Sequence, residues 1–453
     1  MNVIIAGGGK LGFALAEDAV ANGHDVVMID QNPSVIERIE PKLDLGSVVG
    51  HAAGYEVLIE AGVRDCDVFV AATVSDELNI ISAIMAGKLG ASVTMARVRN
   101  PEFSSQVSFV RDSLGITHLL NPDLEAAREI ATLIRFPEAL SVETFAGGRI
   151  SMVELVVEPG TILDGISLKN FKGRCGDLLV CVVRRGETVF VPDGEVVLQA
   201  GDHIHVTGEI DRLAGLYRTM GTEARRIRSM LIIGGGRITY YLLALTQKAK
   251  IAVKVIETKR DVAEKLLAEY PWVNMTMGDG TDYDFLEDAG LSDYDLVLPL
   301  TGIDEENALI AMYAKQHERL KVVTKVNRTH MLPLLSRLGI ETMITPVRVT
   351  ADFVLRQLRS LEASAGQAAV ALYRLEDHAI EVSEFYVQAE NGITGRPLFE
   401  LDLQPGVLVA SLVREHQVIF PDGRETIKMG DHVVIVSYEG TVATLGDIIR
   451  QKR

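Results

Sequence analysis

The chain has 453 residues, of which 47% are hydrophobic and 24% are charged. This length exceeds one ordinary domain of about 100–150 residues, so we expect three or four domains. The 62 acidic and 45 basic residues give a formal net charge of −17. Such a surface repels phosphate backbones and anionic lipid headgroups. We therefore expect no nucleic-acid partner, and any attachment to a membrane should run through a protein.

No apolar run approaches the ~20 residues that a membrane helix needs. The N-terminus also lacks a basic segment followed by an apolar one, as a secretory signal would require. We therefore expect a cytoplasmic protein. The three cysteines, Cys66, Cys175 and Cys181, have neither the number nor the spacing of a disulfide framework or a zinc site. We expect no metal.

Motifs of the first half of the chain return in the second half at a nearly constant distance. Gly7-Gly8-Gly9 returns as Gly234-Gly235-Gly236, an offset of 227 residues (234 minus 7). So small a drift over the whole length indicates two tandem copies of one unit. Further pairs at offsets of 227 to 229 are Asp30 with Glu257, Thr73 with Thr301, Asn79 with Asn307, Pro192-Asp193-Gly194 with Pro421-Asp422-Gly423, and Gly201-Asp202-His203 with Gly430-Asp431-His432.

Each copy begins with short apolar runs that alternate with amphipathic stretches. Strands that alternate with helices are typical of a parallel sheet with helices on both faces. In the first copy we expect strands at Val3–Ala6, Asp25–Ile29, Asp67–Ala72 and Ser92–Val98, and helices that include Leu11–Asn22 and Asn79–Leu89.

The later part of each copy has alternating runs punctuated by tight-turn sequences, which predicts a small β-rich domain. In the first copy we expect strands at Ile150–Val157, Leu178–Arg184, Thr188–Val191 and His203–Val206. The predicted fold class is α/β, with two Rossmann-like doubly wound domains, each followed by a small β-rich α+β domain. The predicted boundaries are 1–135 and 229–361 for the Rossmann domains, and 141–223 and 367–453 for the β-rich domains.

A G-x-G-x-x-G motif runs from Gly7 to Gly12, directly after the first strand and at the start of the first helix. In that context Gly7 allows a tight turn and Gly9 lets the backbone approach a pyrophosphate. Gly12 allows close packing of the helix on the sheet, and the helix N-terminus offers N–H groups to phosphates. The alternative is an ordinary glycine turn.

Asp30 ends the second strand, 23 residues after Gly7, where a carboxylate accepts hydrogen bonds from a ribose. A carboxylate there favours NAD or an adenine nucleotide over NADP. In the second copy Glu257 keeps the 23-residue spacing, but Thr239 replaces the third glycine. We expect a Rossmann domain there too, with weaker or altered nucleotide binding.

Other polar residues follow the third and fourth of these strands, at the edge where such sheets bind ligands. We expect the Thr73 hydroxyl near the ribose or adenine. Asp76 and Glu77 begin the next helix, and helix capping is the preferred reading for them. Arg97 is a candidate phosphate partner, and its alternative is a surface ion pair. Lys325 replaces it in the second copy.

Together these motifs resemble the TrkA family, the regulatory proteins of Trk-type potassium-uptake systems. The stretches that carry the resemblance to its KTN (RCK N-terminal) domain are Ile4–Gly12, Thr73–Asn79 and Ala96–Arg99. Pro192-Asp193-Gly194 and Gly201-Asp202 carry the resemblance to its C-terminal regulatory domain. The tandem duplication is itself typical of the family, and the resemblance covers essentially the whole chain.

The resemblance implies a peripheral protein on the inner face of the cell membrane that binds NAD(H) and also ATP or ADP. It implies a homo-oligomer, a ring of two or four chains, that gates a membrane potassium channel or transporter. The nucleotide contacts implied for the first site are Gly7, Gly8, Gly9, Lys10, Leu11, Gly12, Asp30, Thr73, Val74 and Arg97. Those implied for the second site are Gly234, Gly235, Gly236, Arg237, Ile238, Glu257, Asp279 and Thr301.

One departure from the family pattern separates the two copies. A G-D-x-[ST] element is present as Gly278-Asp279-Gly280-Thr281, but the first copy reads Gly50-His51-Ala52-Ala53. The first copy thus loses both the acid and the hydroxyl. We expect the adenine ends of the two sites, and hence their nucleotide preferences, to differ.

Two other functions are kept as alternatives. An NAD-dependent oxidoreductase would need an acid–base group beside the nicotinamide, and no catalytic constellation is recognisable in the sequence. His203 and His205 alternate as ordinary strand residues do. A scaffold with non-binding Rossmann folds is disfavoured by the retained Gly7, Gly9, Gly12 and Asp30. We expect no catalytic residues and no enzyme activity.

Overall fold

The computed structural model describes the chain except residues 102–113, 137–138, 146–148, 210–211, 214, 217–226, 318, 365–370, 376–378, 389–391, 416, 439–441, 443 and 451–453. The chain divides into two compact units. The first unit contains residues 1–131 and 227–355, which is all but the last few residues of each predicted Rossmann segment. The second unit contains residues 132–226 and 356–453, and therefore both β-rich segments.

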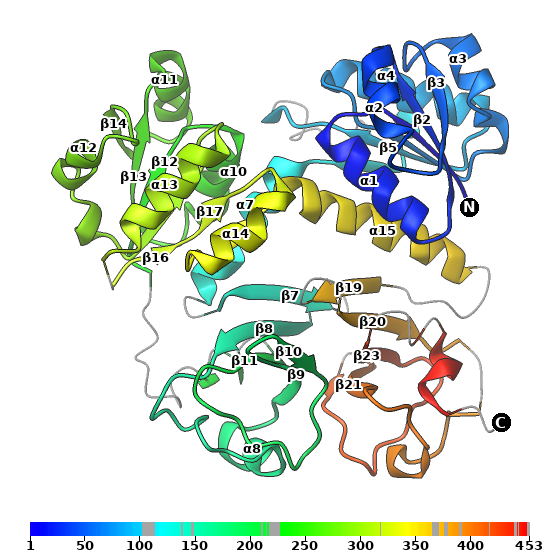
Figure 1. Cartoon of the computed structure of the whole chain (residues 1–453), viewed down its shortest axis with the longest axis vertical. Coiled ribbons are helices and arrows are strands. Elements are labelled where there is room, and N and C mark those ends of the chain that lie inside the picture. The colour runs from blue at the N-terminus through cyan, green and yellow to red at the C-terminus, as the bar shows by residue number, and fades with distance from the viewer. Residues whose placement is uncertain are drawn as a thin grey trace. The chain divides into compact units, whose positions relative to one another are not determined.

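The first sheet is wholly parallel, with strand order β3-β2-β1-β4-β5-β6 (Figure 1). This is the doubly wound order in which the chain starts at the centre and builds outward in both directions. Its strands are β1 (Asn2–Ala6), β2 (Asp25–Asp30), β3 (Gly46–Val49), β4 (Val68–Ala71), β5 (Val93–Arg97) and β6 (His118–Leu120). Its helices are α1 (Lys10–Ala21), α2 (Pro33–Ile39), α3 (Tyr55–Glu60) and α4 (Asp76–Leu89).

The strands and helices predicted for the first sheet are confirmed here. The expected strands agree with β1, β2, β4 and β5 to within one residue at each end. Helix α4 begins at Asp76, where the sequence placed the start of this helix, because the Ser75 side chain accepts a hydrogen bond from the Leu78 N–H and caps the helix.

The second sheet repeats the arrangement, with order β14-β13-β12-β15-β16. Its outer part is broken at Val323, so that the short strand β17 (Thr324–Lys325) pairs separately with β18 (Met343–Ile344). The remaining strands are β12 (Ser229–Ile233), β13 (Ala252–Glu257), β14 (Asn274–Met277), β15 (Leu296–Pro299) and β16 (Lys321–Val322). The helices are α10 (Arg237–Thr246), α11 (Arg260–Glu269), α12 (Tyr283–Asp288), α13 (Asp304–Ala314) and α14 (Leu332–Arg337).

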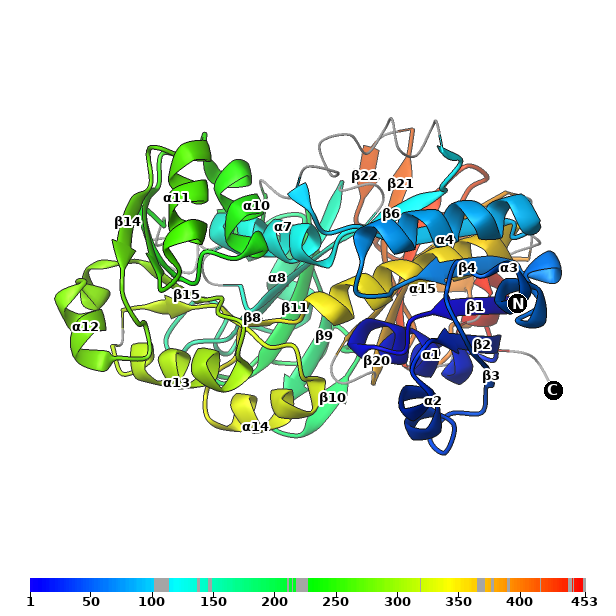
Figure 2. The same ribbon diagram turned by 90° about the horizontal axis from the view of Figure 1, so that it is seen from above.

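Each copy places its last helix on the other copy within the first unit. Helix α7 (Pro122–Arg135) leaves the first sheet and lies beside α10, whereas α15 (Pro346–Ser364) leaves the second sheet and lies beside α1 (Figures 1 and 2). Arg348 on α15 lies 3.7 Å from Asp18 on α1, and Phe353 packs edge-on against His118 with ring centroids 5.8 Å apart. The two Rossmann domains of one chain therefore contact each other in the same way, each through its last helix.

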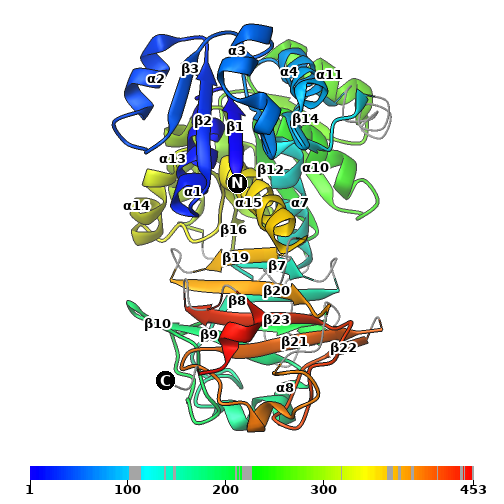
Figure 3. The ribbon, with the colours of Figure 1, turned by 90° about the vertical axis from the view of Figure 1, so that its right-hand side faces the viewer.

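The second unit contains two antiparallel sheets of the same topology, β10-β9-β11-β8-β7 and β22-β21-β23-β20-β19. Figure 3 shows the strands of both sheets side by side, and buried residues of both, among them Ile150, Val182, Val382 and Val434, share one hydrophobic core. The strands are β7 (Ser141–Phe145), β8 (Ile150–Val156), β9 (Leu179–Arg185), β10 (Thr188–Phe190), β11 (His203–Gly208), β19 (Ala371–Leu375), β20 (Ile380–Tyr386), β21 (Leu408–Arg414), β22 (Gln417–Ile419) and β23 (His432–Tyr438). The short helix α8 (Phe171–Cys175) precedes β9.

The repeated Gly-Asp-His motif has a structural role in this unit. The Asp202 carboxylate is buried and accepts two hydrogen bonds from Arg185, at 2.8 and 2.7 Å, and one from the Gln199 N–H. In the second copy Asp431 accepts two from Arg414, both at 2.9 Å. Such bidentate pairs tie the turn before β11 or β23 to the neighbouring strand.

We expect Asp202→Ala to lower the free energy of unfolding of the second unit by about 1–3 kcal/mol, because Arg185 and the Gln199 N–H lose their buried acceptor. Urea unfolding followed by circular dichroism measures this change. The control is Glu187→Gln, an exposed acid beside the same hairpin, which should leave stability unchanged. Equal effects of the two substitutions would contradict the assigned role.

Glu154 on β8 should make the second unit sensitive to acid. Burial raises the pKa of Glu154, but the hydrogen bond from His203 and the charges of His205 and His203 outweigh burial and lower that pKa from 4.5 to about 2. The stabilisation from the ionised carboxylate is therefore complete above pH 4.5 and is lost as the pH falls towards 2.

We expect Glu154→Gln to be less stable than the natural chain at pH 6, and this difference should shrink steadily as the pH is lowered to about 2. Thermal unfolding midpoints measured across that range provide the comparison. A stability difference that does not change with pH would show that Glu154 does not titrate as assigned.

Candidate functional site

The glycine-rich loop between β1 and α1 has the geometry that close approach of a phosphate requires. Gly7 has φ +108°, and a β-carbon on it would lie 2.8 Å from the Thr73 nitrogen. A β-carbon on Gly12 would lie 1.8 Å from the Gly7 carbonyl oxygen, so the helix packs directly on the loop. Gly9 instead has nothing within 4 Å of a β-carbon and caps α1. The first N–H groups of α1, which lack partners inside the helix, therefore lie next to open space.

Asp30 holds this loop in place. Its two carboxylate oxygens accept hydrogen bonds from the N–H groups of Gly8, at 2.7 Å, and Asn32, at 2.9 Å. Glu257 repeats the first contact with the Gly235 N–H at 2.6 Å. Each carboxylate oxygen can accept further hydrogen bonds, so both acids can hold the loop and bind a ribose hydroxyl together.

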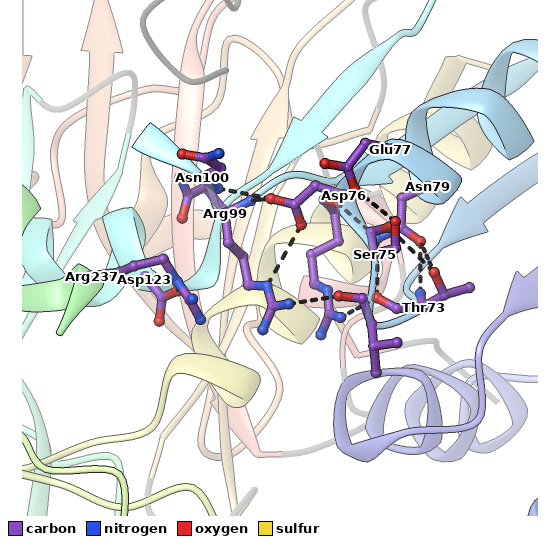
Figure 4. Close-up of polar contacts among 12 residues, drawn as sticks. Thr73, Ser75, Asp76, Glu77, Asn79, Arg99, Asn100, Asp123 and Arg237 are labelled. Atoms are coloured by element: carbon purple, nitrogen blue, oxygen red, sulfur yellow. Dashed lines mark hydrogen bonds and ion pairs between the residues drawn. The ribbon is translucent and has the colours of Figure 1, made fainter. Parts of the chain in front are cut away.

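Asn79 positions the segment between β4 and α4 (Figure 4). Its side chain is fully buried, and its Oδ1 accepts from the N–H and the hydroxyl of Thr73, at 2.8 and 2.7 Å. Its Nδ2 donates to the carbonyls of Thr73 and Arg97. Asn307 repeats three of these contacts, with the Thr301 N–H and the carbonyls of Thr301 and Lys325. The Thr73 hydroxyl, expected near the nucleotide, thus already has a protein partner.

Asp76 and Glu77 lie in the first turn of α4 and serve the local structure, although the side chain that caps the helix is Ser75. Asp76 Oδ2 accepts from the N–H groups of Arg99 and Asn100, both at 2.8 Å, and so ties the start of α4 to the end of β5 (Figure 4). Glu77 accepts from the Ser75 hydroxyl at 2.8 Å. Asp76 Oδ1 is buried without a hydrogen-bond partner among the described residues and lies 3.7 Å from Arg99 Nε.

A cavity of about 570 Å³ opens over the first loop. This volume lies within the ~300–1,000 Å³ typical of small-ligand sites. All predicted first-site residues line it except Gly12, which packs beneath the loop. The predicted lining residues are Gly7, Gly8, Gly9, Lys10, Leu11, Asp30, Thr73, Val74 and Arg97. The second copy contributes Arg237, Lys325, Asn327, Pro346 and Val347.

A second cavity, of about 540 Å³, opens over the loop between β12 and α10. Thr239 here replaces the third glycine, is fully buried, and donates from its hydroxyl to the Gly234 carbonyl at 2.6 Å. Asp279 accepts from the N–H and hydroxyl of Thr281, and these bonds lower the pKa of Asp279. Gly235 does not line the cavity. The predicted residues that line it are Gly234, Gly236, Arg237, Ile238, Glu257, Asp279 and Thr301.

The two cavities adjoin. Asp123, Arg237 and Lys325 line both, and Arg237 Nε lies 2.6 Å from Asp123 Oδ2. Beside this ion pair, the Tyr241 hydroxyl donates to the Arg99 carbonyl at 2.9 Å. The sequence prediction missed Asp123, Arg99 and the second role of Arg237, because these contacts join residues of different copies. The one sequence signal for the second role of Arg237 is its place directly after the glycine loop, where the first copy also has a basic residue, Lys10.

Arg97 lies in the first cavity and donates to the Thr73 carbonyl. Within the described residues it forms no ion pair, so the surface ion-pair alternative does not hold there. Burial, and then the charge of nearby Arg99, lower the pKa of Arg97 to about 10. The positive charge of the Arg97 guanidinium is therefore not neutralised by a carboxylate of the described residues, which suits an anionic ligand.

Other kinds of site receive no support from the described residues. No group of acidic, histidine or cysteine side chains there could hold a metal ion, and the cysteines are free. In that part of the chain no helix combines the length and the apolar character needed to cross a bilayer. His203 interacts with Glu154 and Arg184 within the second unit and lines neither cavity.

The fold and site define a tandem pair of Rossmann domains with ligand cavities at their glycine loops, each followed by a β-rich domain. The TrkA-N domain model matches residues 3–122 and 230–346, and the TrkA-C domain model matches residues 152–221 and 382–450. The chain belongs to the TrkA family.

Relatives match over nearly the full length. The Trk system potassium uptake protein TrkA homolog of Archaeoglobus fulgidus is 31% identical, over 99% of this chain and 100% of its own. The Trk system potassium uptake protein TrkA of Haemophilus influenzae is 28% identical, over 96% and 95%. The GsuK channel bound to NAD shares the fold, with TM-score 0.62 and 18% identity over 98% of this chain and 77% of that one. These relatives are named for potassium uptake or as a channel, and not for a catalysed reaction.

We expect Gly12→Ala to destabilise the first unit by about 1–3 kcal/mol, because its β-carbon would overlap the Gly7 carbonyl oxygen. Gly9→Ala is the matched control in the same loop, since its β-carbon enters open space, and it should change stability little. Urea unfolding of both variants tests this. A stable Gly12→Ala variant would mean that the loop and helix are farther apart than described.

Proposed function

We propose that this chain is a nucleotide-responsive regulatory subunit that gates a membrane potassium channel or transporter of the Trk type. The observation that carries the proposal is the pair of adjoining cavities, each built on a glycine loop at a helix N-terminus. Membership of the TrkA family supplies the transport context.

NAD(H) and ATP or ADP are the proposed ligands of these cavities. The N–H groups at the start of α1 or α10 would hold the phosphates, and Asp30 or Glu257 would accept hydrogen bonds from a ribose. The open space beside Gly9 and Gly236, where a β-carbon meets nothing within 4 Å, fits a pyrophosphate against the backbone. The GsuK channel bound to NAD has a similar fold.

The proposed mechanism is a shift between two conformations. A ligand moves such an equilibrium only through its different affinity for the two states. Moving a gate from mostly closed to mostly open takes about 10⁴-fold preference, or about 5.5 kcal/mol. Two cavities in each chain, multiplied in a homo-oligomeric ring of two or four chains, divide this requirement into about 1 kcal/mol per site.

The shared wall offers a physical route between the cavities. Asp123 and Arg237 form an ion pair that faces both of them. Phosphates in the first cavity would compete with Asp123 for Arg237, which also begins α10 beneath the second cavity. Binding in one cavity would thus alter the charge presented to the other.

The proposed location is the inner face of the cell membrane, reached through the potassium-transporting partner. An oxidoreductase is the less supported alternative. Within the described residues no histidine lines either cavity, and the family relatives are named for potassium uptake.

The double variant Gly9→Ala/Gly236→Ala tests the function. Each added methyl would occupy the space beside the loop without a clash in the protein, so the fold should persist. We expect calorimetric titrations with NAD, NADH, ATP and ADP to show nucleotide binding weakened at least about tenfold. Asp30→Ala is less suitable, because it would also release the Gly8 N–H.

The same variant should lose nucleotide-dependent potassium flux when tested with its transporter partner in vesicles. Gly62→Ala is unsuitable as a control, since that glycine has φ +82°. Gly173→Ala, in open space in the second unit, is the matched control and should retain normal regulation. Normal nucleotide-dependent flux in the double variant would overturn the proposal.

A further inference from the structure

The two cavities have opposite charge. Six basic and two acidic side chains line the first, and three basic and four acidic side chains line the second. The first set is Lys10, Arg38, Arg97, Arg99, Arg237 and Lys325, with Asp30 and Asp123. The second set is Arg237, Lys259 and Lys325, with Asp123, Glu257, Asp279 and Glu306. Asp123, Arg237 and Lys325 line both cavities, so the difference in charge comes from the residues that line only one of them.

A one-residue shift of an arginine accounts for part of this contrast. Arg99, two residues after Arg97, lines the first cavity, but its counterpart in the second copy is Asn327. The basic residue of the second copy stands one place later, as Arg328. Its side chain turns onto Asp304, at 3.3 Å, and onto Glu305, so its charge is neutralised away from the second cavity.

Two other equivalent positions change in the same direction. Leu78 lines the first cavity, and Glu306 stands at its counterpart in the second. Asp279 lines the second cavity, where the first copy has His51, which does not line its cavity. The two cavities therefore keep the same backbone framework, while the net charge of their lining side chains changes from positive to negative.

The first cavity also holds buried donors without partners. The Nε atoms of Arg97 and Arg99 are buried and have no hydrogen-bond partner among the described residues. Arg99 Nη2 donates to the Val74 carbonyl at 3.0 Å, and its only carboxylate neighbour in the described chain is Asp76 at 3.7 Å. These clustered cations have few compensating acceptors in the protein, which favours a ligand with several anionic oxygens.

We infer that the two cavities are specialised by charge. The first takes a nucleoside triphosphate, and the second takes a dinucleotide of lower charge such as NAD. A triphosphate concentrates negative charge at one end, whereas the cationic nicotinamide of NAD partly offsets the charge of its pyrophosphate. Asp279 and Glu306 would repel a triphosphate from the second cavity. This inference rests on the proposed function, because it assigns ligands to the same cavities.

Single-cavity variants give the direct test. In Gly236→Ala the first cavity stays intact, and in Gly9→Ala the second does. We titrate each calorimetrically with ATP and with NAD, in EDTA so that divalent cations do not mask the phosphate charge. We expect ATP to bind the first cavity at least about tenfold more tightly than NAD, and the order to reverse at the second. The ATP affinity of the first cavity should fall more steeply with salt than its NAD affinity.

Charge substitutions in the otherwise natural chain give an independent test. Arg99→Asn copies the second cavity and should weaken ATP binding about tenfold, with NAD binding changed less than threefold. Its control is Arg328→Asn, the shifted arginine outside the cavities, which should leave both affinities unchanged. Glu306→Leu should strengthen ATP binding at the second cavity about three- to tenfold.

The outcomes of these titrations distinguish the charge specialisation of the cavities from nucleotide regulation itself. The same ligand preference in both cavities, or equal effects of Arg99→Asn and Arg328→Asn on ATP binding, would overturn the charge specialisation and leave nucleotide regulation standing. No binding of any nucleotide to the natural chain would overturn the proposed function and this inference with it.

Discussion

The ion pair between Asp123 and Arg237 lies where the two copies of the Rossmann domain meet. It exists because each copy places its last helix on the other: α7 carries Asp123 to α10, and α15 reaches α1 through Arg348 and Asp18. As a consequence the two cavities share a wall. A ligand in either cavity therefore meets charges that also face the other, which neither domain would provide by itself.

Each cavity also depends on a small set of side-chain contacts with the backbone that both copies retain. Asp30 and Glu257 fix the glycine loops, and Asn79 and Asn307 fix the neighbouring strand ends. These groups act on backbone N–H and carbonyl groups, whose positions depend little on the surrounding side chains. The framework of the site is thereby preserved, and the side chains that face the ligand are free to diverge, as Arg99 and Asn327 do.

The second unit also repeats its buried polar contacts in both copies. The bidentate pairs of Asp202 with Arg185 and of Asp431 with Arg414 occupy equivalent turns. A buried carboxylate is costly unless it is paired and hydrogen-bonded, so each of these acids specifies one conformation of its turn. The sequence marked these residues through their repetition, but their partners emerged only from the antiparallel pairing of β9 with β11 and of β21 with β23.

The sequence alone determined the duplication, the order of strands and helices, and the glycine loops with their acids, because local periodicity and backbone sterics dictate these features within a few residues. It also placed nearly all the loop residues that line the cavities. Only the tertiary structure decided that the cavities adjoin, that Asn79 holds the Thr73 segment, and that Arg99 faces the first cavity while Arg328 turns away. The adjoining cavities depend on contacts between residues more than 100 positions apart, such as Asp123 with Arg237. The other two facts depend on the direction of a single side chain, which no local sequence pattern encodes.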